Sequence, residues 1–282
     1  MLIGPSDLHL HSTRSDGTEP PAEVMAQAFA AGVRTAALTD HDTTDGWDEA
    51  ADAARRLGMT LIPGAELSAK HGGHSVHVLA YLFDPASPTL VDLMSRVRES
   101  RTGRAERLVA NLSRDYDVTW RDVVEQREAD ATVGRPHIAD ALIARGIVAS
   151  REEAFASLLA PWGPYYVPHD APTPLDVVRA VRDAGGVTVI AHPAGRGMLP
   201  DAVHRALIEA GLGGFELDHR ENTPEGRAVL AELVAEHDLI VTGSSDYHGS
   251  GKPNRPGENT TSDAMVARIV AAASGTAPVG PS

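Results

Sequence analysis

The chain contains no cysteine among its 282 residues. Disulfide bonds and thiolate metal ligands are therefore both excluded, and any bound metal must be held by imidazole nitrogens and carboxylate oxygens. Aromatic residues are also scarce, at 4%, whereas 13 histidines and 39 acidic residues are present. The side chains that remain available for a metal site are thus well represented.

Long apolar runs are missing as well. No stretch of 18 apolar residues occurs, and the N-terminal MLIGPSDLHLHS lacks the basic region and apolar core of a signal peptide. The sequence therefore predicts a cytoplasmic protein that does not enter a membrane. No stable protein partner is predicted either.

Basic residues are fewer than acidic residues, and the formal net charge is −14. Such a charge repels nucleic acid and anionic membranes at a distance. A phosphorylated substrate would need a local positive site, and bound metal ions can provide it.

Short apolar runs alternate with helical patterns, which is typical of βα units around a parallel sheet. This pattern predicts an α/β fold of one main domain with an insertion, and seven strands fit a closed or nearly closed barrel. The predicted strands begin at Asp7, Thr35, Met59, Ser75, Val187, Gly214 and Leu239.

The strand pattern disappears between about residues 91 and 171, where helical stretches with arginines at 96, 98, 101, 104 and 107 replace it. We therefore predict a discontinuous barrel domain, 1–90 and 172–275, and a helical insertion domain, 91–171. The C-terminal residues 276–282 contain little that can pack, so they are predicted to form a flexible tail.

His9 and His11 flank Leu10 on the first predicted strand. Side chains two residues apart on a strand project from the same face, so both imidazoles can chelate one metal ion. An HxH triplet alone is a weak signal. The loop STRSDGT that follows brings Asp16, which in isolation is better explained as a turn or helix cap.

Further histidines and carboxylates fall where later strands are predicted to end. Each has an ordinary alternative, such as a capping aspartate or a hydrogen-bonded core histidine, and for His77 alone the core histidine is the better explanation. Jointly they predict a metal cluster at one rim of the barrel. These candidates are Asp40, His41, Glu66, His77, His192, Asp246 and His248.

Four segments in order, DLHLHSTRSDGT, LTDHDT, IAHP and GSSDYHG, resemble the motifs of the polymerase and histidinol phosphatase (PHP) superfamily. The segments GRPHIADAL and GGFELDH resemble its standalone phosphoesterases, which act on nucleoside 3',5'-bisphosphates and on the 5' ends of short oligonucleotides. The resemblance implies a distorted (β/α)7 barrel with a trinuclear metal site. Tyr247 stands where the family more often has Phe, which puts only substrate preference in doubt.

The resemblance also implies how the ligands are shared among two or three divalent ions of Mn, Fe or Zn. Glu66 would bridge the first and second ions, and Asp40 would support the ligands from behind. The first ion would be held by His9, His11, Glu66 and Asp246, the second by Glu66, His77 and His192, and the third by Asp16, His41 and His248. A hydroxide that bridges the metals would attack phosphorus.

Three residues are predicted to act on the substrate. Arg135 precedes the helical pattern IADALIA, so it and the helix N-terminus can bind a phosphate together, although an ordinary helix start with a surface arginine is the alternative. Arg101 is a second predicted contact of the substrate. The arginines around it recur every three residues, and a helix face exposed to solvent explains that series more simply. His219 follows a predicted strand and can donate a hydrogen bond or a proton. With Glu66 and Asp246 it completes the predicted catalytic set.

We therefore expect a metal-dependent phosphoesterase that acts on a small phosphorylated nucleotide or a short oligonucleotide. It would remove the 3'-phosphate of a nucleoside 3',5'-bisphosphate, release 5'-end mononucleotides, or do both. A histidinol-phosphate-type phosphomonoesterase is one alternative, which the GRPHIA segment and the insertion disfavour. A non-catalytic module associated with nucleic acid or a polymerase is another, and the full set of candidate ligands weighs against it.

Overall fold

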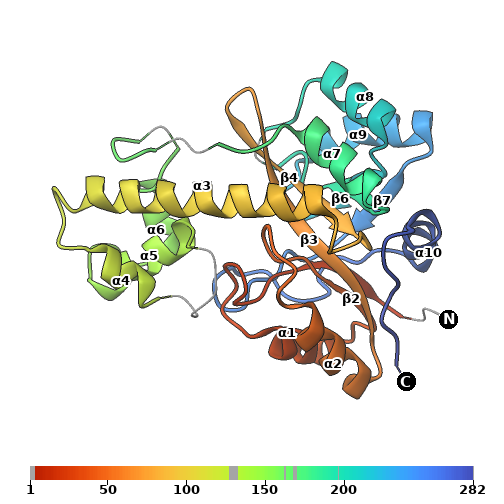
Figure 1. Ribbon diagram of the computed structural model, residues 1–282, viewed down its shortest axis with the longest axis horizontal. Helices are drawn as coiled ribbons and strands as arrows, with labels where there is room; N and C mark the ends of the chain where they lie inside the picture. Colours follow the sequence, from red (N-terminus) through yellow and green to blue (C-terminus); the bar gives the residue numbers. More distant parts are fainter. Residues whose placement is uncertain (1–3, 127–132, 162, 168–169, 196, 282) are drawn as a thin grey trace.

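The computed structural model describes residues 4–126, 133–161, 163–167, 170–195 and 197–281. Residues 127–132 of the predicted insertion, as well as 162 and 168–169, lie outside this description. Figure 1 shows a barrel at the N- and C-terminal parts of the chain and a group of helices that stands apart from it.

All seven predicted strands are present, and they form one sheet whose spatial order equals their order in the chain. The strands are β1 (Ser6–Leu10), β2 (Thr35–Leu38), β3 (Thr60–His71), β4 (His74–Tyr81), β5 (Val187–Ile190), β6 (Gly214–Asp218) and β7 (Ile240–Gly243). The sheet nearly closes on itself, because the segment after β7 lies beside β1. There the backbone N–H of His11 donates to the carbonyl of Tyr247 at 2.9 Å.

The sheet is not wholly parallel, contrary to the βα pattern that the sequence predicts. β3 runs on past Pro63 to His71 and turns back into β4, which is antiparallel to both β3 and β5. The turn consists of Gly72 and Gly73 at φ of 55° and 84°. Two left-handed residues in succession suit a two-residue hairpin, and glycine adopts that conformation without steric cost. The hairpin extends well beyond the barrel (Figure 1).

Helices cover the outside of the barrel and form the separate group. They are α1 (Pro21–Ala30), α2 (Trp47–Leu57), α3 (Pro88–Leu112), α4 (Trp120–Val124), α5 (Arg135–Ala144), α6 (Arg151–Ala156), α7 (Pro174–Asp183), α8 (Asp201–Ala210), α9 (Pro224–His237) and α10 (Asp263–Ala272). In the part of the chain that the structure describes, no helix combines the length and apolar character of a membrane span.

The long helix α3 connects two hydrophobic cores. Leu90, Met94 and Val97 in its first half pack into the barrel cluster. Leu108 and Leu112 in its second half belong to the cluster of α4, α5 and α6. A single helix therefore runs from the barrel into the helical group that stands beside it (Figure 1). The domain boundaries at 91 and 171 stay a prediction.

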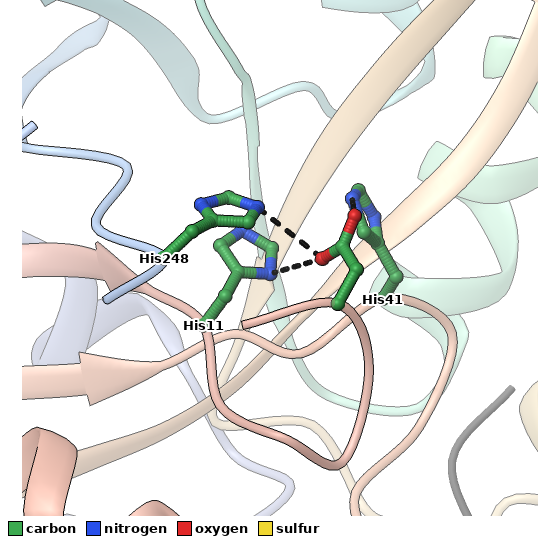
Figure 2. A group of neighbouring side chains, drawn as sticks. His11, His41 and His248 are labelled. Atoms are coloured by element: carbon green, nitrogen blue, oxygen red, sulfur yellow. Dashed lines mark ion pairs between the residues drawn. The ribbon is translucent and has the colours of Figure 1, made fainter. Parts of the chain in front are cut away.

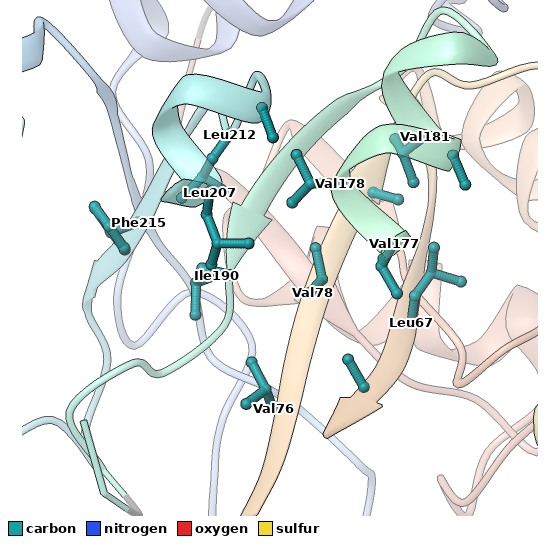
Figure 3. Packing of buried hydrophobic residues seen from close by; sticks show 14 of the residues in the cluster. Leu67, Val76, Val78, Val177, Val178, Val181, Ile190, Leu207, Leu212 and Phe215 are labelled. Atoms are coloured by element: carbon teal, nitrogen blue, oxygen red, sulfur yellow. The ribbon is translucent and has the colours of Figure 1, made fainter. Parts of the chain in front are cut away.

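The largest apolar cluster lies between the sheet and the helices α7 and α8. Figure 3 shows Leu67 and Val78 of the β3–β4 pair facing Val177 of α7, with Ile190 and Leu207 beside them. Burial of such side chains stabilises the fold by roughly 1.5–3 kcal/mol each. This core supports β3 and β4 from behind, so their rim residues are held in fixed positions.

Residues 276–281 differ from the flexible tail that their composition predicts. The N–H of Thr276 donates to the carbonyl of Leu82 at 2.8 Å, and Val279 exchanges two backbone hydrogen bonds with Leu61 at 2.8 and 2.9 Å. Main-chain hydrogen bonds need no apolar side chains, so composition does not reveal them.

Candidate metal centre

The nine predicted metal ligands come from strands and loops far apart in the chain, and they meet in one cluster. All but His77 and His192 are buried, and each lies within 4 Å of another member. The nine are His9, His11, Asp16, His41, Glu66, His77, His192, Asp246 and His248. The strands other than β4 run parallel and place their C-terminal ends at one rim. Glu66 and His77 instead lie within the antiparallel pair of β3 and β4.

The carboxylate of Glu66 lies at the centre of the cluster. Its Oε2 is 3.2 Å from His9 Nε2, 3.0 Å from His11 Nε2 and 3.3 Å from His41 Nδ1. Glu66 lies on β3, opposite His41, to which a single β-bridge connects it. One oxygen thus faces three imidazoles that come from two different strand ends.

The second oxygen of Glu66 faces the β4 and β5 side. Oε1 is 2.6 Å from His77 Nδ1 and 3.5 Å from His192 Nε2. The sequence predicts that His77 and His192 share an ion with Glu66; in the structure the tightest group on this side is His41, Glu66 and His77. His192 adjoins it, with its ring centroid 5.4 Å from that of His77.

Asp246 completes the group that the sequence assigns to a first ion. Its Oδ1 is 3.4 Å from the Nε2 atoms of both His9 and His11, and these residues with Glu66 offer ligand atoms that all lie within 4.8 Å of one another. The φ of Asp246 is 55° and that of His192 is 31°. Left-handed conformations of non-glycine residues cost of order 1–3 kcal/mol and collect at functional sites.

A third group surrounds Asp16. Its Oδ1 is 3.2 Å from His248 Nε2 and 3.8 Å from His11 Nδ1, and its Oδ2 is 3.8 Å from His41 Nε2. Figure 2 shows His11 and His248 side by side, with His41 opposite them. The sequence places His11 only in the first group, whereas in the structure its two ring nitrogens face two groups.

The loop that carries Asp16 is held by Asp40. The Asp40 carboxylate accepts hydrogen bonds from the backbone and hydroxyl of Ser12 at 2.8 and 2.6 Å and from the hydroxyl of Ser15 at 2.6 Å. It reaches His11 only through Ser15, whose Oγ is 3.4 Å from His11 Nδ1. Asp40, predicted to support the ligands from behind, contacts them through the loop.

Glu216 is a buried residue of this centre that the sequence did not reveal. Its Oε1 is 2.9 Å from His9 Nδ1, and its Oε2 accepts the backbone N–H of His192 at 2.8 Å. A carboxylate on one ring nitrogen fixes the tautomer and leaves the other nitrogen available for a metal. The only local signal was an acidic residue inside the apolar strand GGFEL.

We expect Glu216→Gln to weaken metal binding about 10- to 100-fold, because such supporting carboxylates typically contribute that much. Activity at saturating metal should fall less than the affinity does. A titration of metal into the chelated protein, followed by calorimetry, measures the effect. Glu232→Gln on the exposed face of α9 is the matched control. Equal metal affinity in both variants would contradict the role of Glu216.

The three carboxylates of the cluster are held in their ionised form. Burial opposes ionisation, but the imidazoles of His41 and His248 hold the pKa of Asp16 well below its usual range. Against the same burial, His41 and His77 lower the pKa of Glu66, and Lys252 and His248 lower that of Asp246. Ionised carboxylates are the form that binds divalent cations.

The donor set fits divalent metal ions. The Nε2 atoms of His9 and His11 are only 3.0 Å apart, and both face Glu66 Oε2. His41 Nδ1 is buried and makes no hydrogen bond to the described residues. Burial lowers the pKa of His9, yet Glu216 and Glu66 outweigh it and raise this pKa well above the usual value. A position that attracts a proton this strongly also attracts a metal cation.

The cluster opens into a cavity of about 940 Å³ between the barrel rim and the helical group. Although the whole protein is acidic, basic side chains are numerous on the walls of the cavity. They are Lys70, Arg101, Arg104, Arg135, Arg151, Arg220 and Lys252. Some of them pair with carboxylates, as Arg151 does with Asp140 and Lys252 with Asp246, and bound metal ions would add positive charge beside them.

Both predicted substrate arginines line this cavity. Arg101 is tied to Asp42, with its Nη1 3.1 Å from the Asp42 carboxylate. Arg135 begins α5, donates to the carbonyl of Leu159 at 3.2 Å and stacks over the ring of Phe155. Arg101 comes from α3 and Arg135 from the start of α5, so both belong to the helical wall of the cavity.

His219 and Lys252 flank Asp246 on the side away from His9. The ammonium of Lys252 is 2.6 Å from Asp246 Oδ2, and His219 Nε2 is 3.8 Å from the same oxygen. His219 Nδ1 accepts the N–H of Glu221, so the ring proton resides on Nε2. Sequence reasoning predicted His219 but missed Lys252, which lies in the turn after GSSDYHG.

Comparison with known proteins agrees with this geometry. The model of the PHP domain family matches residues 7–131. The chain is 34% identical to a 3',5'-nucleoside bisphosphate phosphatase of Chromobacterium violaceum over 88% of its own length and 89% of that protein. It is also 34% identical to a 5'-3' exoribonuclease of Haemophilus influenzae, with 86% and 89% of the two chains covered.

A third relative, a phosphoribosyl 1,2-cyclic phosphate 1,2-diphosphodiesterase of Eggerthella lenta, is 34% identical over 86% of this chain and 94% of that protein. Among solved structures, one from Bifidobacterium adolescentis, described as a metal-dependent phosphoesterase, superposes with a TM-score of 0.93 at 42% identity. This superposition covers 95% of this chain and 96% of that one. The chain therefore belongs to the PHP domain family and is a hydrolase of phosphoric esters.

Proposed function

We propose that this protein hydrolyses phosphoesters of nucleotides with two or three divalent metal ions. The observation that carries the proposal is the Glu66-centred cluster, which opens into a cavity with basic walls. Two reactions suit this site: removal of the 3'-phosphate of a nucleoside 3',5'-bisphosphate, and release of 5'-end mononucleotides from short oligonucleotides. The names of two relatives support these substrates.

The proposed ligand sets follow the three groups of the cluster. His9, His11, Glu66 and Asp246 would hold one ion, and Asp16, His41 and His248, with His11 adjoining, a second. Glu66, His77 and His192 would hold a third. Such ions polarise phosphoryl oxygens and lower the pKa of water toward neutrality. Nitrogen and oxygen ligands of this kind suit manganese, iron or zinc.

The protein's own groups would then orient the substrate. Arg101 and Arg135 would face the phosphate from the helical wall. His219, whose pKa burial lowers, is a neutral imidazole with its N–H on Nε2, so it would donate a hydrogen bond to a phosphoryl or leaving oxygen. Asp246 would orient His219 and hold a metal at the same time, which makes both residues candidates for the catalytic set with Glu66.

The test is a comparison of substrates on metal-loaded protein. Adenosine 3',5'-bisphosphate, a 5'-phosphorylated oligonucleotide, a phosphoribosyl cyclic phosphate and histidinol phosphate are incubated separately, and released phosphate or nucleotide is measured. We expect turnover of one or both of the first two. Exclusive turnover of the cyclic phosphate or of histidinol phosphate would overturn the proposed substrate class. No turnover of any of the four would favour a binding module.

Arg135→Ala is expected to raise KM for the nucleotide roughly 10- to 100-fold while kcat changes less, because a charge-assisted hydrogen bond is typically worth about 1.5–3 kcal/mol. Steady-state kinetics on the preferred substrate measure this split. Arg145→Ala at the other end of α5 is the matched control, since Arg145 pairs with Asp117 and does not line the cavity. A fall in kcat alone would contradict the binding role.

A further inference from the structure

Two members of the cluster come from neighbouring loops. Asp16 lies in the loop between β1 and α1, which we call the Asp16 loop (residues 11–20). His248 lies in the segment after β7, which we call the His248 loop (residues 244–252). Asp16 Oδ1 is 3.2 Å from His248 Nε2, and both belong with His41 to one group of ligand atoms. An ion in that group can bind only while the two loops keep this spacing.

Hydrogen bonds join the two loops just beyond Asp16. The N–H of Thr18 donates to the carbonyl of His248 at 3.2 Å, and the N–H of Ser250 donates to the Thr18 hydroxyl at 2.9 Å. Gly249 lies between these contacts with a φ of 65°, and a Cβ at this position would collide with the Thr18 hydroxyl. The close approach of the loops therefore needs a glycine there.

Tyr247 of the His248 loop contacts both ends of the Asp16 loop. Its carbonyl accepts the N–H of His11 at 2.9 Å, and its hydroxyl donates to the carboxylate of Glu19 at 2.9 Å. The carbonyl of Glu19 in turn accepts the N–H of Thr13 at 2.9 Å, which closes the Asp16 loop at its base. A single residue thus connects the start and the end of one ligand loop to the other.

The ring and the hydroxyl of Tyr247 have different surroundings. The ring belongs to a buried apolar cluster that includes Leu10 of β1 and Met25 of α1. A phenylalanine ring would fill the same space, so this packing does not require a hydroxyl. The hydroxyl adds a charge-assisted hydrogen bond, which is stronger than a neutral one. Glu19 is only half-buried, so without this bond its carboxylate is free to turn to water.

We propose that Tyr247 is a positioning residue for the metal ion of Asp16, His41 and His248, and that it acts through its hydrogen bond to Glu19. The inference rests on the proposed function, because it takes these three side chains as ligands of one ion. Glu66, which reaches the other two ligand groups, lies on β3 and takes no part in the contact between the loops. Ions held by Glu66 should therefore depend little on the Tyr247 hydroxyl.

The experiment titrates manganese calorimetrically into chelated protein. Asp16→Asn identifies the ion in question, because Asp16 belongs to that ligand group alone. We expect Tyr247→Phe to raise the Kd of this same ion at least about 10-fold and that of the remaining ions less than about twofold. Tyr165→Phe is the matched control: the hydroxyl of Tyr165 also donates to a carboxylate, that of Asp115, at 2.7 Å, but the residue does not line the cavity.

Variants of the acceptor separate the hydrogen bond from the packing of the ring. Glu19→Ala should weaken the same ion as much as Tyr247→Phe does, and the double variant should be no weaker than either single variant. Glu19→Gln keeps an oxygen that accepts the hydroxyl, so it should recover part of the affinity. A merely structural role of Tyr247 would instead lower the melting temperature of the chelated protein and weaken all ions alike.

Wild-type affinity for the Asp16 ion in Tyr247→Phe would overturn the proposal, and so would additive losses in the double variant or equal weakening of every ion. If Asp16→Asn loses no ion, the ligand group itself is wrong and the role of Tyr247 falls with it. Failure of the wild type to hydrolyse nucleotides would overturn only the proposed substrate class. The titration does not depend on turnover, so it would still decide on Tyr247.

Discussion

Glu66→Gln is expected to reduce kcat by at least about 10³-fold. Glu66 places one oxygen within 3.3 Å of three imidazoles and the other within 3.5 Å of two more, so its charge is shared by every part of the cluster. Metal ions at such a site contribute several kcal/mol to transition-state stabilisation, and each loss of about 1.4 kcal/mol lowers the rate tenfold. Glutamine nearly preserves the shape but carries no charge that could balance bound cations.

Two measurements check this expectation. Steady-state kinetics at saturating metal report kcat, and elemental analysis of the dialysed protein reports how much metal remains bound. We expect metal content to fall by at least one ion per chain in Glu66→Gln, whereas Glu232→Gln on the exposed face of α9 retains wild-type values. Unchanged metal content together with unchanged kcat would show that Glu66 does not hold the metals.

Removal of the metals with a chelator is expected to abolish activity and to lower the melting temperature by about 10 °C. Ligands that bind only the folded state stabilise it by about 4 kcal/mol when present at 1,000 times their Kd. For a chain of this size each kcal/mol corresponds to roughly 2–4 °C. The effect is expected to be large because Asp16, Glu66 and Asp246 are buried and ionised within one cluster.

Differential scanning calorimetry before and after chelation measures the change, and addition of manganese or zinc should restore both the melting temperature and the activity. In Glu66→Gln the same treatment should lower the melting temperature much less, because less metal is there to remove. A chelated wild-type protein that keeps its melting temperature and its activity would exclude a metal centre at this rim.

The fold was largely predictable because its signals are local. Seven apolar runs at the observed places predicted the seven strands of the barrel. The direction of β4 was not predicted, since a strand's orientation depends on which neighbour it meets. Here the glycine pair at 72 and 73 turns the chain back at once, so no helix separates β3 from β4. The alternation of apolar runs and helical patterns, which predicted the other strands, does not indicate the direction of a strand.

The supporting residues of the site were far less visible. Glu216 lies 207 positions from His9 in the chain, and Lys252 follows Asp246 in a turn whose path no periodicity describes. Asp40 could be predicted as a partner of the centre, but not that it acts through Ser12 and Ser15. Their roles arise from contacts between loops, and loops carry no repeating pattern from which such contacts can be read.

The amino-acid sequence by itself determined the kind of chemistry: without cysteine, only imidazoles and carboxylates at strand ends can hold a metal, and their spacing is a property of the chain. The tertiary structure alone decided which oxygen of Glu66 faces which imidazole, that His11 stands between two groups, and that Arg101 of α3 reaches Asp42 of the barrel. The reason is physical, since charge and hydrogen bonding act over a few ångströms in space, and only the folded backbone sets those distances.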